Sequence, residues 1–471
     1  MDSIAAKSGD RAISIERHSL TLMSAEPRTV LTMGDAIALI VGIVVGAGIF
    51  RTPSLVAANA GTEETFLSAW MLGGAVSLVG ALCYSELTTT FPSTGGDYHF
   101  LGRAYGKNLA FLFAWARIAV IQTGSVALLA FIFGDYISQI YSLGEYSSVI
   151  YAAIAVTGLT AINIVGLRFG TGAQKLLTTV EVIGILLIIA AGFFLAPSSA
   201  PTDTPASTAT SSFGLTMVFV LLTFGGWNEA AYISGELRAG RTGKHRMAIA
   251  LIVGIAGITA LYMLVNLAYL NALGLSGMAV SEAVGGDLMR VTFGSGGVFL
   301  ISILVSVSAL TSANATIFTG ARTNYSMGRD FPVFASLGKW NARASAPVNA
   351  LIAQGLIAII LVALGLFTRK GFETIVEYTA PVFWLFFLLV GIALFVLRRK
   401  ESDVERPFRV PLYPLTPLLF CLTSAYLLYS SLVYTGLGAF LGVAVLLVGA
   451  FLLAALPAIE NFKQKNHRGG L

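Results

Sequence analysis

The chain has 471 residues, of which 56% are hydrophobic and only 11% are charged. A soluble globular protein needs more polar surface than this, so the composition predicts an all-α polytopic membrane protein. Two cysteines and four scattered histidines exclude a disulfide framework and a metal cluster, so we expect no cofactor. The formal net charge of +5 resides in connecting loops and does not imply a nucleic-acid partner.

Twelve apolar spans follow one another along the chain, and they are separated by polar or charged connections. They cover Leu31–Ala58, Phe66–Phe91, Asn108–Gln139, Ser148–Val165, Ala173–Leu195, Ser211–Leu237, Arg246–Ala272, Gly297–Met327, Pro347–Phe367, Phe372–Leu397, Pro414–Tyr429 and Leu432–Leu456. Of the 29 lysines and arginines, 24 lie in the two tails and in the connections after even-numbered spans. By the positive-inside rule, we expect a multi-pass protein of the cell membrane with both termini in the cytoplasm.

Small residues interrupt the first span at its centre, in the stretch VGIVVGAGIFRT (Val41–Thr52). Gly46 and Gly48 tolerate backbone torsion angles that an ordinary helix does not adopt. A break here leaves the first amides of the following half-helix without acceptors, at the positive end of its dipole. Within a membrane such backbone has to line a cavity, where a carboxylate is a natural occupant. Gly42 and Gly46 also form a small-xxx-small pattern, so this span alone leaves helix packing open as the explanation.

The sixth span, LLTFGGWNEAAYISGEL (Leu221–Leu237), is interrupted in the same way by Gly225 and Gly226. The first and sixth spans open two successive sets of five. Paired interruptions at corresponding positions favour a transporter with inverted repeats over packing alone.

Six stretches resemble those of an amino acid permease of the amino acid–polyamine–organocation superfamily, closest to its L-amino-acid-transporter-like bacterial branch. They are GIVVGAGIF (Gly42–Phe50), ALCYSELTTTFPSTGGDYHFLGRAYG (Ala81–Gly106), FGGWNEAAYISGELR (Phe224–Arg238), SANATIFTGARTNYSMGRD (Ser312–Asp330), PVNALIAQG (Pro347–Gly355) and RPFRVPLYPLTPLLF (Arg406–Phe420). The resemblance implies the leucine-transporter fold, with 12 transmembrane helices, a 5+5 inverted repeat and broken helices 1 and 6.

The expected organisation follows from this fold. It comprises a cytoplasmic tail (1–30), a first repeat (31–195), an external linker (196–210), a second repeat (211–397), two further helices with a preceding cytoplasmic junction (398–456) and a C-terminal tail (457–471).

The resemblance also implies a substrate site between the two breaks. The carboxylate of an amino acid would lie on the amides of the first break, and its ammonium on carbonyls of both breaks. The residues expected there are Val44, Gly46, Ala47, Gly48, Ile49, Leu222 and Gly225. Selectivity for the substrate side chain is expected from flanking apolar residues, which are Val120, Ile121, Leu222, Phe224, Trp227 and Phe383.

Gly225 favours a neutral substrate, because relatives that take cationic amino acids can carry an acid at this position. The alternative within transporters is a polyamine or cationic amino acid carrier, supported by Glu181 and Glu229. A membrane-embedded amino acid sensor is the alternative from a different class, and it would need a signalling domain that the short tails do not provide. We expect no enzyme, because no nucleophile–base pair is apparent. Residues 139–147 contain no cysteine, so no disulfide-linked heavy subunit is expected.

Glu181 departs from the family pattern in the fifth span. Sodium-independent relatives commonly have a lysine where AQKLLTTVEVIGI (Ala173–Ile185) places this glutamate. A carboxylate inside the membrane has to be protonated, ion-paired or bound to a cation. Three explanations stay open: coupling to H+, a Na+ site completed by hydroxyls, or an ion pair with Arg117 or another basic group. The hydroxyls in question belong to Ser308, Thr311 and Ser312.

Overall fold

The computed structural model describes residues 44–93, 95–165, 171–196, 212–229, 241–341, 344, 346–368, 371–433 and 437–468. Over these residues the secondary structure is helical, apart from one isolated bridge between Asn341 and Ala346. The helices are η1 (Ala47–Phe50), α3 (Thr52–Ala60), α4 (Glu63–Thr90), α5 (Asp97–Tyr105), α6 (Lys107–Ala116), η2 (Arg117–Ile121), α7 (Gln122–Ile140), α8 (Ser147–Val165), α9 (Thr171–Ala190), η3 (Ala191–Leu195), α10 (Phe213–Thr223), η4 (Trp227–Glu229), α12 (Arg241–Ala279), α13 (Val284–Asp330), η6 (Pro332–Phe334), α14 (Val348–Thr368), α15 (Gly371–Lys400), α16 (Leu415–Val433) and α17 (Leu437–Arg468).

Nine helical stretches of the described chain are long and apolar enough to cross a membrane. They include α4, the continuous α6–η2–α7 helix, α8, most of α12, and α13 to α17. Two shorter apolar helices, Thr179–Leu195 and Phe213–Thr223, accompany them. The first expected span is described only from Val44 onward. The protein is therefore a multi-pass, all-helical membrane protein, while its twelve-helix count remains a prediction.

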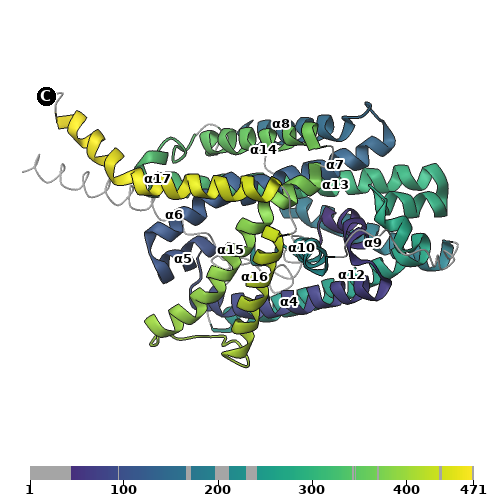
Figure 1. Cartoon of the computed structure of the whole chain (residues 1–471), viewed down its shortest axis with the longest axis horizontal. Helices are drawn as coiled ribbons and strands as arrows, with labels where there is room; N and C mark the ends of the chain where they lie inside the picture. The colour runs from purple at the N-terminus through teal and green to yellow at the C-terminus, as the bar shows by residue number, and fades with distance from the viewer. Residues whose placement is uncertain are drawn as a thin grey trace, which may run out of the picture.

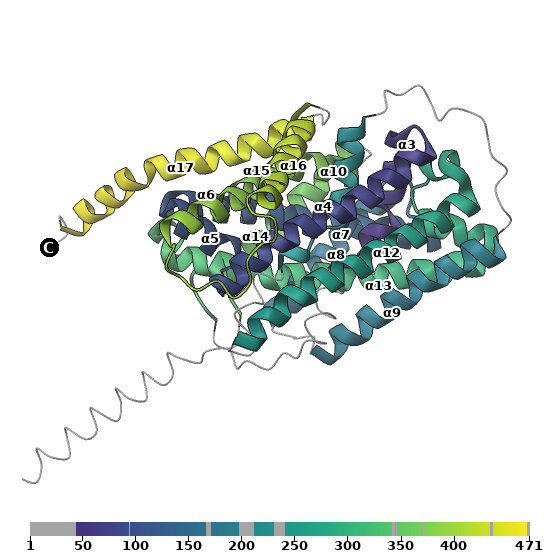
Figure 2. The same cartoon turned by 90° about the horizontal axis from the view of Figure 1, so that it is seen from below.

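Two groups of helices pack around the first interruption, and α15 packs against both α16 and α17 beside them (Figures 1 and 2). In the first group α7, α8, α13 and α14 pack against one another, and in the second α3, α4, α10 and α12 do so. The short helix η1 contacts α7 and α13 of the first group and α10 of the second. The backbone interruption of the first span therefore lies at the boundary between the two groups.

Small residues on α4 allow the sixth span to approach closely. A Cβ atom added at Gly73 would lie 2.3 Å from Cγ1 of Val220, and one at Gly80 would lie 2.6 Å from the ring of Trp227. Any larger residue at either position would push the interrupted helix away, because packed interiors leave no spare volume. These two glycines of α4 therefore position the segment that contains the second break.

Two expected spans differ from the structure at their ends. The α12 and α13 helices each continue through a glycine with positive φ, Gly274 (66°) and Gly294 (64°), so each combines two helical pieces across a kink. Apolar periodicity does not detect such junctions, because hydrophobic residues continue on both sides of the kink.

Candidate functional site

The first interruption lies between Val44 and α3. Gly46 is extended (φ −111°, ψ 177°) and precedes η1, and its amide donates to the carbonyl of Val44 at 2.8 Å. The next regular helix begins only at Thr52. Within the described part of the chain, the amides of Ala47 and Gly48 have no backbone acceptor. The predicted break is therefore present, and among the described residues it leaves two N–H donors without a backbone acceptor at the start of a helical segment.

The second interruption begins where α10 ends, at Thr223. The amide of Gly225 donates to the carbonyl of Leu222 at 3.0 Å, which closes a tight turn. Gly226 follows with φ at 106°, in a region that residues with side chains rarely adopt. The short helix η4 then begins at Trp227. Residues 230–240, in the second half of the expected span, lie outside the described residues.

Tyr262 of α12 joins the two interruptions. Its buried hydroxyl donates to the carbonyl of Val44 at 2.9 Å and lies 3.3 Å from the carbonyl of Thr223. The breaks are also adjacent in space, because a Cβ atom added at Gly48 would lie 3.7 Å from Cγ2 of Thr223. Tyr262 is not among the site residues predicted from the sequence. One sequence feature could have indicated it: Tyr262, Asn266 and Tyr269 form a polar stripe along one face of an apolar span. All three residues are buried.

The aromatic residues expected at the site belong to two clusters. Phe224 packs against Trp70 and Tyr262, with ring centroids 6.1 and 5.1 Å away. Trp227 stacks on Phe387 of α15 at 5.5 Å, and Phe383 contacts the same ring at 4.2 Å. The structure therefore connects Trp227 and Phe383 through Phe387, whereas Phe224 lies among residues of α4 and α12. Leu222 is half-buried at the end of α10.

Val120 and Ile121 lie in η2, a π-helical turn within the continuous α6–α7 helix. Val120 is fully buried and Ile121 is half-buried. The hydroxyl of Tyr378 on α15 donates to the carbonyl of Ala119 at 2.8 Å, so a side chain of α15 binds the backbone of this π-helical turn. Single π-turns within α-helices are frequent at functional positions.

Glu181 of α9 is buried and accepts a hydrogen bond from the hydroxyl of Ser308 on α13. No basic side chain among the described residues forms an ion pair with Glu181, so a pair with Arg117 is not observed. Of the other two hydroxyls expected at this position, that of Thr311 donates to the carbonyl of Val307 in its own helix, and Ser312 is half-buried.

A buried arginine follows the first break directly. The guanidinium of Arg51 lies 3.5 Å from the carboxylate of Asp135 on α7 and 3.4 Å from that of Glu373 on α15. It also donates to the carbonyl of Ser281, in the turn between α12 and α13, at 3.0 Å. The neighbouring hydroxyl of Tyr136 donates to the carbonyl of Phe50 at 2.7 Å. The segment after the first break is therefore tied to three other parts of the bundle.

Two adjacent interrupted helices inside a bundle of apolar helices long enough to span a membrane are typical of membrane transporters. The sequence model of the family described as "Amino acid permease" matches residues 31–455, and the chain belongs to this family. It is accordingly an amino acid transporter and not an enzyme.

Known relatives agree with this assignment. The chain is 30% identical to the human "b(0,+)-type amino acid transporter 1" over 431 residues, which cover 88% of this chain and 85% of the relative. It is 28% identical to the "Serine/threonine exchanger SteT" of Bacillus subtilis (strain 168) over 433 residues, covering 91% and 96% of the two chains. It is 30% identical to the human "Large neutral amino acids transporter small subunit 2" over 435 residues, covering 88% and 78%.

Proposed function

We propose that the protein is a secondary active transporter that moves neutral L-amino acids across the cell membrane by alternating access. Both termini would be cytoplasmic, and residues 31–195 and 211–397 would form the two inverted repeats. The observation that carries this proposal is the bridge that Tyr262 makes between the two interruptions, because it holds both of them at one position in the bundle.

The substrate would bind through its backbone groups at this position. The amides of Ala47 and Gly48, which have no backbone acceptor among the described residues, suit a carboxylate, since N–H donors at a helix start attract anions. Ile49 and Gly46 complete this turn. The ammonium group would lie near the carbonyls at the end of α10, from Leu222 to Gly225, and near that of Val44. This arrangement binds any α-amino acid and leaves discrimination to the groups around its side chain.

An apolar surround supports a neutral substrate side chain. Trp227, Phe383, Val120 and Ile121 provide no charge, and Gly225 itself adds no carboxylate at the second break. A cationic side chain would lose hydration there without gaining a partner. Two relatives agree with this choice in their names, one as a serine/threonine exchanger and the other as a carrier of large neutral amino acids.

Glu181 is the proposed ion-coupling group, with H+ as the coupling ion. A buried carboxylate whose described partner is a serine hydroxyl is most easily accommodated in its protonated form. A Na+ ion held by Glu181 and Ser308 is the second candidate, because hard cations prefer oxygen ligands. Thr311 contributes less to such a site, since its hydroxyl already donates within its own helix. An exchange mode without net ion movement is the third outcome.

Uptake into proteoliposomes tests both parts of the proposal. A labelled panel of Ser, Ala, Leu, Lys, Arg and putrescine would be offered with an imposed proton gradient, with a sodium gradient, and without either. We expect uptake of the neutral amino acids, with acceleration by an inward proton gradient. Strong uptake of Lys, Arg or putrescine with little Ser, Ala or Leu would instead assign the protein as a cationic amino acid or polyamine carrier. Binding of amino acids without uptake of any would support the sensor alternative.

A further inference from the structure

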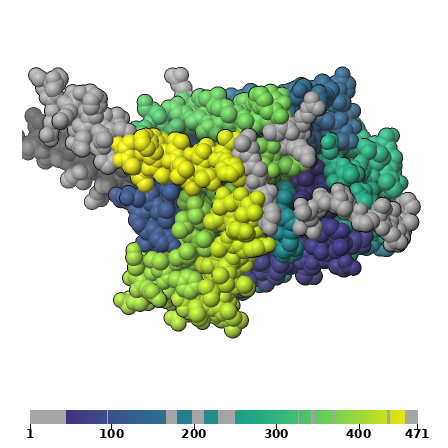
Figure 3. Space-filling model, viewed as in Figure 1, coloured from purple at the N-terminus to yellow at the C-terminus, as the bar shows by residue number. Residues whose placement is uncertain are grey.

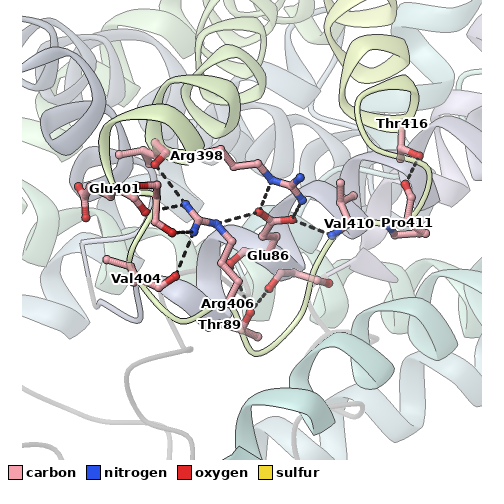
Figure 4. Close-up of polar contacts among 12 residues, drawn as sticks. Glu86, Thr89, Arg398, Glu401, Val404, Arg406, Val410, Pro411 and Thr416 are labelled. Carbon is pink, nitrogen blue, oxygen red and sulfur yellow. Dashed lines mark hydrogen bonds and ion pairs between the residues drawn. The ribbon is translucent and has the colours of Figure 1, made fainter.

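The connection between α15 and α16, residues Glu401–Pro414, is held in place by one buried carboxylate (Figure 4). Glu86 of α4 accepts two hydrogen bonds from Arg398, at 2.7 and 2.5 Å. It also accepts from the amide of Val410 at 2.7 Å and lies 3.5 Å from Nε of Arg406. Arg406 then donates to backbone carbonyls of the same connection, including that of Glu401 at 2.9 Å. The charges of Arg398 and Arg406 are therefore satisfied inside the protein.

A second set of contacts fixes the beginning of the connection. Arg103 of α5 donates to both carboxylate oxygens of Glu401, at 2.7 and 2.6 Å, and this pairing lowers the pKa of Glu401 below its ordinary value. Lys400 donates to the carbonyl of Ala104 at 2.8 Å. The connection is thus a preformed surface, since its shape is set by contacts with α4 and α5.

Two further arginines of this region point outward. Arg399 and Arg409 are exposed, and neither forms an ion pair with another residue that the structure describes. Large apolar side chains are exposed beside them in sequence: Leu412 is 75% exposed and Leu415 is 62% exposed. In Figure 3 this yellow-green part of the chain protrudes from the bundle. The guanidinium of Arg398 lies over the ring of Tyr413, 3.7 Å from its centroid. Tyr413, which follows Leu412, is therefore in direct contact with an arginine that binds Glu86.

We propose that this surface binds an anionic phospholipid of the adjacent leaflet, with Arg399 and Arg409 on the headgroup phosphate and Leu412 and Leu415 among the acyl chains. Arginines without a described ion pair and exposed leucines a few positions away in the sequence match the two chemical parts of a lipid molecule. An acidic soluble partner would engage the arginines but would leave the leucines in water. A free phosphate ion would likewise make no use of the leucines. This inference does not depend on the substrate or the coupling ion of the transporter.

Lipid binding by the full-length protein tests the proposal. The purified protein would be exposed to an equimolar mixture of phosphatidylglycerol and phosphatidylcholine, and the retained lipids would be counted by native mass spectrometry. The test variant is Arg399→Gln with Arg409→Gln. The matched control is Arg329→Gln with Lys339→Gln, which removes two other exposed cations from the region around the end of α13. Since these side chains are on the surface, melting temperatures should stay within a few degrees of wild type.

We expect wild-type protein to retain phosphatidylglycerol in preference to phosphatidylcholine. Each basic residue near an anionic lipid contributes about five-fold in binding, so the test variant should bind phosphatidylglycerol about 25-fold more weakly. The control variant should change this affinity less than about two-fold. Leu412→Ala with Leu415→Ala should weaken the retention of both lipids. The proposal fails if the test variant and the control variant lose phosphatidylglycerol to the same extent, or if the wild type does not prefer phosphatidylglycerol. It also fails if glycerol phosphate displaces the lipid at a comparable concentration.

Discussion

The hydroxyl of Tyr262 donates to the carbonyl oxygen of Val44 across 2.9 Å, although 218 positions separate the two residues in the sequence. The same oxygen of Tyr262 lies 3.3 Å from the carbonyl of Thr223, at the end of α10. A single side chain of α12 thereby contacts the last residue before each break. Any rearrangement that moves one interrupted helix relative to the other has to change this contact.

Replacing Tyr262 by Phe should lower amino acid uptake at least about ten-fold while the protein stays folded. The ring contacts with Trp70 and Phe224 remain, but the hydrogen bonds to the interrupted helices are lost, and each buried bond contributes about 1 kcal/mol or more. Uptake by proteoliposomes measures the effect. Tyr269→Phe is the matched control, because Tyr269 is equally buried on the same helix and its hydroxyl has no described hydrogen-bond partner. Equal losses in both variants would remove Tyr262 from the proposed site.

Gly48→Val should abolish substrate binding without preventing folding. A methyl group at this position meets Thr223 at an ordinary contact distance of 3.7 Å, so Gly48→Ala should fold and keep part of its activity. The two additional methyl groups of valine enter the space beside the amides of Ala47 and Gly48, where the substrate carboxylate would lie. Binding of labelled substrate to both purified variants separates the outcomes. Normal binding by Gly48→Val would contradict a carboxylate site at the first break.

Both interruptions could be predicted from the sequence because glycine is a local signal, and the observed breaks lie where Gly46, Gly48, Gly225 and Gly226 occur. The expected span Phe66–Phe91 likewise corresponds to α4, since an apolar stretch of that length is also a local property. Contacts between distant helices could not be predicted in this way.

Two residues illustrate this limit. Tyr262 resembles an ordinary core tyrosine until its hydrogen-bond partners are known. The direction of the Thr311 hydroxyl is equally hidden, because a threonine on a helix can always donate to its own backbone, as it does here to Val307.

Gly225→Asp should reduce uptake of neutral amino acids and improve competition by Lys or Arg. The new carboxylate would lie beside the second break, where it can pair with a cationic side chain. Part of the loss will come from the backbone, because any Cβ atom at Gly225 would lie 2.9 Å from the carbonyl of Leu222. Gly225→Ala isolates that part. The prediction fails if both variants show the same ratio of Lys to Leu inhibition in competition assays.

Arg51→Gln should weaken the contacts that tie the segment after the first break to α7 and α15. The substitution leaves Asp135 and Glu373 without their cation, and loss of one partner from a buried pair typically costs about 3–5 kcal/mol. A cysteine at position 52 measures how far water and reagents reach this segment, because Thr52 is fully buried in the structure. Thr52→Cys would be introduced into a protein in which both native cysteines are replaced by alanine. We expect several-fold faster labelling of this cysteine by a membrane-impermeant maleimide. Arg290→Gln, which removes an exposed arginine paired with Asp287, should leave the rate unchanged.

Glu181→Gln should retain exchange of amino acids but lose its response to an inward proton gradient. Glutamine mimics the protonated carboxylate, so the hydrogen bond with Ser308 and the volume of the side chain are kept while the proton can no longer be released. Ser308→Ala is the complementary variant, because it removes the hydroxyl but leaves the titratable group in place. It should alter the pH at which uptake is half-maximal and still respond to the gradient. Uptake by proteoliposomes between pH 5 and 8, with and without an imposed gradient, measures both. An unchanged pH dependence in Glu181→Gln would exclude Glu181 as the proton site, and sodium-stimulated uptake by the wild type that this variant lacks would assign it to Na+ instead.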